Sequence, residues 1–139
     1  MTTPILKVKQ LRAAYGKAQV LHGLNVDVAK GSVITVIGPN GAGKSTFLNC
    51  LIGMLPSQGV IEFNGQSINE LTLEERVMQG ISLVPENREL FSTMTVEDNL
   101  MLGGKSTSEA AITSGVAIRC NHPRNLGGAT GGSMLTFKA

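Results

Sequence analysis

The chain has 139 residues, of which 42% are hydrophobic and 16% charged, proportions typical of one folded globular domain. A net charge of +2, without a basic block that contains aromatic residues, gives no reason to expect a nucleic-acid partner. The two cysteines lack the spacing of a metal site. Neither an apolar run of roughly 20 residues nor a signal peptide is present, so we expect a cytoplasmic protein.

The first forty residues favour strands. Ile5, Leu6 and Val8 open a short strand, and residues 24–28 alternate apolar and polar side chains, so we expect an antiparallel hairpin. Residues 33–37 are a nearly unbroken β-branched run, which is typical of a strand covered on both faces. This strand would lead directly to Gly38.

The next segment predicts a helix over residues 44–52 that ends at Gly53. Its inward positions are expected to be Phe47, Leu48, Leu51 and Ile52. Residues 60–68 predict a hairpin around Asn64-Gly65, because this pair tolerates the positive φ angles of a tight turn. We expect this hairpin to belong to a sheet separate from the parallel one.

Two Thr-x-x-acid patterns predict helix starts. Thr72 with Glu75 forms a capping box, and Thr95 with Asp98 imitates one before a helix over residues 96–102. Residues 81–84 between them, apolar except for Ser82, predict a second buried strand.

The clearest motif runs from Gly38 to Ser45 and satisfies G-x-x-x-x-G-K-[ST]. Its glycines let backbone N–H groups converge on phosphate oxygens, while Lys44 supplies a charge for the β- and γ-phosphates and Ser45 a hydroxyl for Mg²⁺. A chance Gly-rich turn is the alternative, which a strand before the motif and a helix after it disfavour. With an α-phosphate contact from Thr46, the predicted loop residues are Gly38, Pro39, Asn40, Gly41, Ala42, Gly43, Lys44, Ser45 and Thr46.

The loop has the form Gly-Pro-Asn-Gly-Ala-Gly-Lys-Ser-Thr and follows Val-Leu-His-Gly-Leu-Asn-Val at residues 20–26. In both features the chain resembles the ATP-binding domains of ABC transporters. A GTPase would need Asn-Lys-x-Asp, which is absent, and small-molecule kinases lack the antiparallel hairpin before the loop. The resemblance implies an α/β P-loop fold of the ABC ATPase type with an N-terminal antiparallel β subdomain, and it implies ATP and Mg²⁺ as cofactors.

The resemblance also implies an adenine site. Tyr15 would stack on the base, and Val20 would contact the same ring edge. A core tyrosine is the alternative, but the polar sequence Ala-Ala-Tyr-Gly-Lys around Tyr15 indicates a turn and not a strand.

Residues 84–100 resemble the stretch after the second core strand of this family. Most members have Gln where Glu86 stands, and Val-Pro-Glu is similar to the second ATP-binding subunit of branched-chain amino acid importers. Glu86 would ligate Mg²⁺ through oxygen; the alternative is a solvated loop carboxylate. Because this loop faces the permease in the family, Phe91 and Met94 would form an apolar dock, or else pack as ordinary core residues.

Two family motifs have no counterpart here. Hydrolysis needs an apolar strand that ends in Asp followed by Glu, and neither Asp27 nor Asp98 has that context. The Leu-Ser-Gly-Gly-Gln signature has only a weak echo at residues 125–129, and His122 lacks the strand expected before the family's switch histidine. The catalytic carboxylate is therefore unassigned.

The resemblance covers residues 5 to about 104. Residues 1–104 carry eight basic and nine acidic side chains, whereas residues 105–139 carry four and one. We therefore expect residues 1–104 to be the N-terminal part of an ABC-type ATP-binding domain. Residues 105–139 would be an unassigned tail, frameshifted or disordered, with only a short helix near residues 108–112. Such an incomplete chain would leave the strand at residues 33–37 with an exposed apolar edge.

Two functions follow. In the first, the chain is an ATP-binding subunit, in fragment form, of an importer of branched-chain amino acids. Its partners would be transmembrane permease subunits and a second ATP-binding subunit, and it would lie at the inner face of the cell membrane through the permease. In the second, the chain is a nucleotide-binding remnant without ATPase activity.

Overall fold

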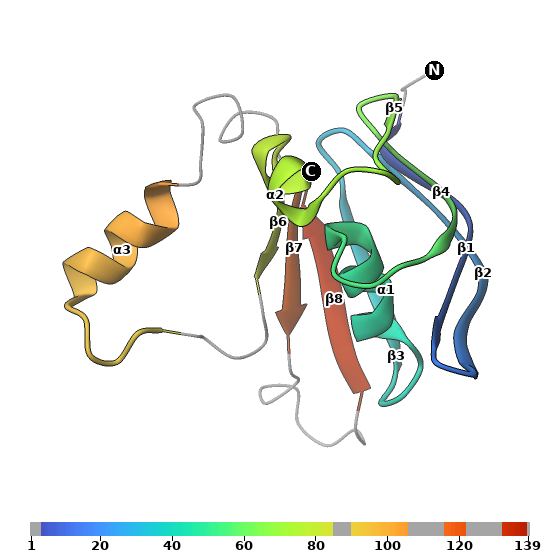
Figure 1. The fold of residues 1–139 in the computed structure, drawn as a ribbon, viewed down its shortest axis with the longest axis horizontal. Coiled ribbons are helices and arrows are strands. Elements are labelled where there is room, and N and C mark those ends of the chain that lie inside the picture. Colours follow the sequence, from blue (N-terminus) through green and yellow to red (C-terminus); the bar gives the residue numbers. More distant parts are fainter. Residues whose placement is uncertain (1–3, 85–89, 106–115, 122–131, 139) are drawn as a thin grey trace.

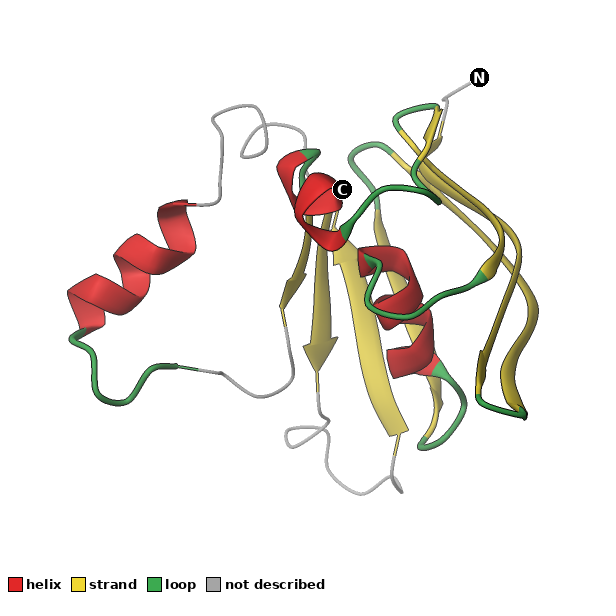
Figure 2. Ribbon diagram, in the orientation of Figure 1, coloured by secondary structure: helices red, strands yellow, loops and turns green. Residues whose placement is uncertain are grey.

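The computed structural model describes residues 4–84, 90–105, 116–121 and 132–138. The elements are β1 (Pro4–Tyr15), β2 (Ala18–Ala29), β3 (Val33–Pro39), α1 (Lys44–Ile52), β4 (Gln58–Phe63), β5 (Gln66–Ser67), α2 (Leu73–Met78), β6 (Ile81–Val84), α3 (Val96–Lys105), β7 (Val116–Asn121) and β8 (Gly132–Lys138). They form one sheet of order β2-β1-β4-β5 and another of order β3-β8-β7-β6 (Figure 1). Helix α1 lies between them and contacts strands of both (Figure 2).

The first sheet is antiparallel throughout, as the sequence predicts. The turn between β4 and β5 has φ 50° at Asn64 and φ 79° at Gly65, which is the positive-φ pair expected there. Strand β1 is longer than predicted and includes Tyr15, which pairs with Ala18. The prediction that Tyr15 lies in a turn is therefore wrong: the β1–β2 hairpin keeps its pairing up to the last residue before the turn.

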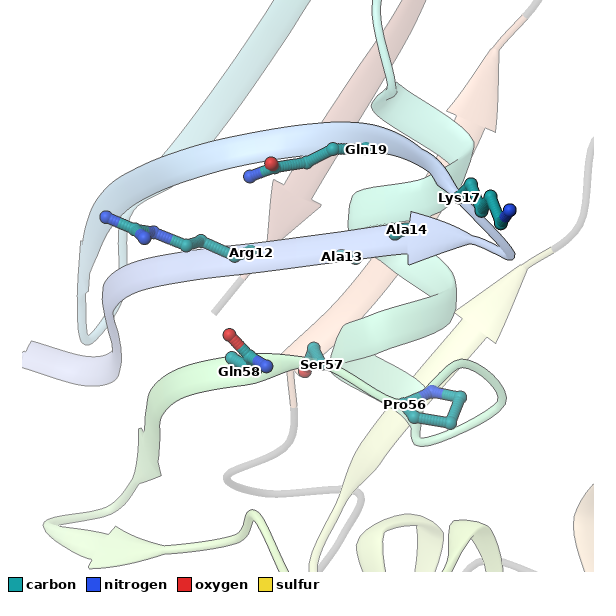
Figure 3. Close-up of a pocket in the computed structure, with 8 residues that line it drawn as sticks. All are labelled: Arg12, Ala13, Ala14, Lys17, Gln19, Pro56, Ser57 and Gln58. Carbon is teal, nitrogen blue, oxygen red and sulfur yellow. The ribbon is translucent and has the colours of Figure 1, made fainter.

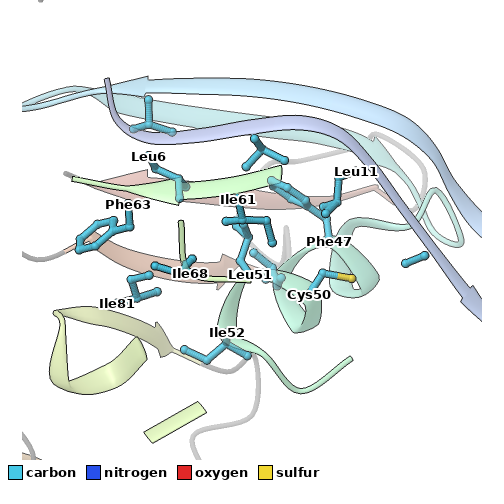
Figure 4. Packing of buried hydrophobic residues seen from close by; sticks show 14 of the residues in the cluster. Leu6, Leu11, Phe47, Cys50, Leu51, Ile52, Ile61, Phe63, Ile68 and Ile81 are labelled. Atoms are coloured by element: carbon cyan, nitrogen blue, oxygen red, sulfur yellow. The ribbon is translucent and has the colours of Figure 1, made fainter. Parts of the chain in front are cut away.

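Helix α1 confirms the predicted helix and its inward face. Its four predicted positions are buried, and Phe47 is only 1% exposed. Gly53 ends the helix with φ 88°, and its N–H donates to the carbonyls of Asn49 and Cys50. Figure 4 shows the helix side chains packed against side chains of the first sheet, among them Leu11 and Ile61. The core thus fixes the helix that follows the Gly-rich loop.

Arg76 of α2 is a buried cation that the sequence pattern does not single out. It is 4% exposed and donates to the carbonyls of Cys50 and Leu51 at 2.9 Å, of Asn69 at 3.0 Å and of Leu71 at 3.1 Å. Burial lowers the pKa of Arg76. The side chain satisfies carbonyls at the end of α1 and places a positive charge at its negative dipole end.

Strand β3 differs from the prediction of a strand covered on both faces. Its side chains alternate between exposed and half-buried, and Ile37 is 78% exposed. Ile34 and Val36 pack against the core, whereas the opposite face is left uncovered by the rest of the described chain. A run of β-branched residues therefore does not distinguish one buried face from two.

The segment after residue 104 contains two strands where the sequence predicted none. Strand β8 pairs antiparallel with the whole of β3, from Val33 opposite Lys138 to Pro39 opposite Gly132. Strand β7 pairs antiparallel with β8 and parallel with β6. One edge of β3 is thus paired with a strand that the sequence did not predict. Because β3 is the first strand in the sheet order, its other edge has no strand partner among the described residues, as expected. The helix predicted near residues 108–112 lies outside the described residues.

Helix α3 begins as the second capping pattern predicts. The hydroxyl of Thr95 accepts from the Asp98 N–H at 3.1 Å and donates to the Asp98 carboxylate at 2.7 Å. The helix stands apart from both sheets (Figure 1), and several of its apolar side chains are exposed. Among the described helices, none is long and apolar enough to cross a membrane.

Candidate functional site

The Gly38–Thr46 loop connects the end of β3 to the start of α1. Its backbone turns sharply, with the Ala42 N–H donating to the Pro39 carbonyl at 3.2 Å. Gly41 and Gly43 have φ angles of 85° and 87°, a region that favours glycine. Because Gly43 is the N-cap of α1 and no side chain caps this end, backbone N–H groups of the first turn are available to an external anion.

Position 43 also has no room for a side chain. A Cβ at this position would meet the side chains of Val20 and Leu21 at 3.1 Å. Strand β2 therefore packs directly against the loop at the point where the helix starts. This contact brings Val20, from a different sheet, to the same site as the loop.

Lys44 is the charged group of the site. It is 7% exposed, and its Nζ donates to the carbonyls of Gly38 and Pro39, each at 2.6 Å. None of the carboxylates in the described ranges forms an ion pair with it. Two neutral carbonyls hold the ammonium without neutralising it, so a positive charge remains at the loop.

The loop surrounds a cavity of about 370 Å³. Its lining offers an ammonium, hydroxyls, an amide and the helix N-terminus, which together form a donor set for phosphate oxygens. The lining residues are Val20, Asn40, Gly41, Gly43, Lys44, Ser45 and Thr46. All seven were singled out from the sequence, and Gly38 and Pro39 contribute through the carbonyls that bind Lys44.

Tyr15 and Ala42 are predicted site residues that do not line this cavity. Tyr15 ends β1, is 50% exposed and does not line the cavity. Glu86 lies outside the described residues, as do residues 125–129 and His122. The adenine contact of Tyr15 and the metal contact of Glu86 stay predictions.

A strand, a Gly-rich loop and a helix arranged around such a cavity define an α/β protein of the P-loop class. The family model described as ABC transporter matches residues 21–130, most of the chain. The chain belongs to the ABC transporter family. The match continues beyond residue 104, and the division of the chain at that residue stays a prediction.

Individual proteins of the family show which members the chain is similar to. The high-affinity branched-chain amino acid transport ATP-binding protein BraG of Pseudomonas aeruginosa is 41% identical over 76% of this chain and 46% of its own length. A relative from Archaeoglobus fulgidus, described as a probable branched-chain amino acid transport ATP-binding protein, is 31% identical over 92% of this chain and 58% of its own. The galactose/methyl galactoside import ATP-binding protein MglA of Treponema denticola is also similar, at 38% identity over 78% of this chain. The chain thus spans about half the length of the curated relatives it matches.

Solved structures show the same fold. The ADP conformation of an ATP-binding cassette of an ABC transporter has a TM-score of 0.68 and 31% identity, covering 81% of this chain and 44% of that one. The fold is therefore that of the ABC ATPases, present here as part of the domain, as the sequence predicted.

Proposed function

We propose that the loop cavity binds the phosphate groups of ATP together with Mg²⁺. The observation that supports this most strongly is the buried Lys44 ammonium, held by two loop carbonyls beside the uncapped start of α1. An ammonium and free N–H groups that face one cavity favour a compact polyanion.

The described residues around the cavity supply part of a ligand set for Mg²⁺. The Ser45 hydroxyl lines the cavity and would provide one oxygen ligand, and the nucleotide phosphates would provide others. Bound Mg²⁺ would neutralise phosphate charge. Glu86, the second proposed ligand, would complete the protein's share of the site. Gly41, Gly43 and the first residues of α1 would orient the phosphates through backbone N–H groups.

For the cellular role, we propose the ATP-binding part of a branched-chain amino acid importer. The names of two similar proteins support this substrate class. The exposed apolar side chains of Phe91, Met94 and Leu100 favour docking on a permease, and a second ATP-binding subunit would complete a dimer. Such a protein would work at the inner face of the membrane.

A second candidate function is nucleotide binding without turnover. One observation favours it: the sequence has only two aspartates, one within β2 and one in the first turn of α3. Neither Asp27 nor Asp98 follows a strand of the β3-containing sheet, where a carboxylate could polarise water beside the γ-phosphate.

The test of nucleotide binding compares Lys44→Ala with Lys30→Ala, a matched change at an exposed lysine. Calorimetric titration with Mg-ATP should show roughly ten- to a hundredfold weaker binding for Lys44→Ala, because a charge-assisted contact is lost, and wild-type affinity for Lys30→Ala. Equal affinities in both variants would contradict the phosphate site.

Turnover separates the two functions. Phosphate release from Mg-ATP by the purified chain, abolished in Lys44→Ala, would support the ATPase and reject the non-hydrolysing alternative. Binding without release would support the alternative.

Permease docking is tested by co-purification with the permease subunits of the Pseudomonas branched-chain importer. We expect retention of the chain, loss in Leu100→Asp, and no retention on permease subunits of a galactoside importer. Equal retention on both permeases would contradict the proposed substrate class.

A further inference from the structure

A second cavity, of about 470 Å³, lies between the β1–β2 hairpin and the segment that joins α1 to β4 (Figure 3). Among the described residues, it has no lining residue in common with the phosphate-loop cavity. Its polar lining residues are Arg12, Lys17, Gln19, Ser57 and Gln58. Nothing in the proposed nucleotide chemistry uses these side chains.

A bulge in β1 creates this space. The β1–β4 register shifts between Lys9 and Arg12, and Gln10 has φ 50°. Gly59 lies against the bulge so closely that a Cβ there would be 2.6 Å from the Gln10 carbonyl oxygen. Beyond Arg12, which pairs with Gln58 at the start of β4, strand β1 continues alongside β2 alone. The unpaired side of this extension borders the cavity.

Arg12, which lines the cavity, has no acidic cross-strand partner among the described residues. Arg12 lies opposite His22 on β2 and opposite Gln58 on β4. Lys7, five residues earlier on the same strand, shows the contrast: it lies opposite Asp27 and Glu62. Among the described residues, the sheet therefore places acidic residues opposite Lys7 but none opposite Arg12.

The side chains around these cations are hydrogen-bonding groups. Figure 3 shows Gln58 directed toward β1 and Gln19 beside Arg12 on the neighbouring strand, with Lys17 at the hairpin turn. None of the described residues that line the cavity is acidic. Arginine, lysine and amide donors without a carboxylate favour anionic oxygens, and the volume is that of a small-molecule site.

We propose that this cavity binds a small organic anion that carries a phosphate or carboxylate group. The Arg12 guanidinium neutralises its charge and the Gln58 amide binds its oxygens, while Lys17 adds positive charge from the hairpin turn. This site does not depend on nucleotide binding at Lys44, because the two cavities have separate lining residues.

The test is a titration of the full chain, followed by the amide NMR signals of each cavity separately. Inorganic phosphate and citrate are the two probes, with sodium chloride at equal ionic strength as the reference. We expect saturable shifts at Lys17, Gln19 and Ser57 with at least one probe. A response to phosphate alone assigns a phosphate-bearing ligand, and a response to citrate assigns a carboxylate. The amide signals of Gly41 and Ser45 show whether the probe binds in the phosphate-loop cavity. Binding at this second site can therefore be distinguished from binding at the proposed nucleotide site.

Two matched double variants decide the role of the cations. Arg12→Gln with Lys17→Gln should weaken the response roughly tenfold or more, since two charge-assisted contacts are lost. Lys9→Gln with Lys30→Gln removes the same charge from exposed positions outside the cavity and should bind as wild type. Equal responses in the two variants, or no saturable shift in the wild type, would overturn the proposal.

Discussion

Helices α1 and α3 have nine and ten residues, yet their surroundings are opposite. Helix α1 buries seven of its side chains between two sheets, whereas α3 leaves Leu100 72% exposed. The difference shows that the proposed nucleotide site is built on an element whose position the core fixes. The apolar face of α3 has no such partner among the described residues, which is consistent with a surface that binds another protein.

The largest effect expected from this contrast is at Phe47. Phe47→Ala should lower the free energy of unfolding by about 3–5 kcal/mol, because it removes a ring from the space between the sheets. Leu100→Ala should change it by less than about 0.5 kcal/mol, because this side chain is already in water. Urea denaturation of the two variants measures both values.

If Phe47→Ala and Leu100→Ala lower the free energy of unfolding by similar amounts, the difference between the two helices is contradicted, and α3 is packed against other residues in solution. A large loss at Phe47 alone would confirm it.

A smaller effect is expected at Arg76, which joins α2 to the end of α1. Arg76→Met should cost about 2–3 kcal/mol, because carbonyls at the end of α1 lose their buried donors. The exposed Lys30→Met is the matched control and should be nearly neutral. Urea denaturation again gives the values. If Arg76→Met is as mild as the control, water replaces the guanidinium, and the link between the helices is dispensable.

Local patterns predicted the part of the fold that carries the site. The loop, α1, the Asn64-Gly65 turn and both helix starts follow from residues that lie close together in sequence, so pattern alone identified them. The role of Arg76 and the exposed face of β3 were not predicted, because both depend on segments far apart in the chain. The strands β7 and β8 were missed for the same reason, since pairing with β3 and β6 defines them.

The smallest effect compares the two helix caps. Thr72 accepts from the Glu75 N–H at 3.3 Å, and Glu75 accepts from the Thr72 N–H at 2.8 Å, a complete capping box beside the core. Thr72→Ala should therefore lower global stability by about 1 kcal/mol. Thr95→Ala removes a similar cap from α3, but a helix that stands apart from the sheets can unfold locally. We expect faster amide hydrogen exchange confined to α3 and almost no change in global unfolding. Equal losses of global stability would show that α3 unfolds together with the sheets, and its apolar face would then be part of the same cooperative unit.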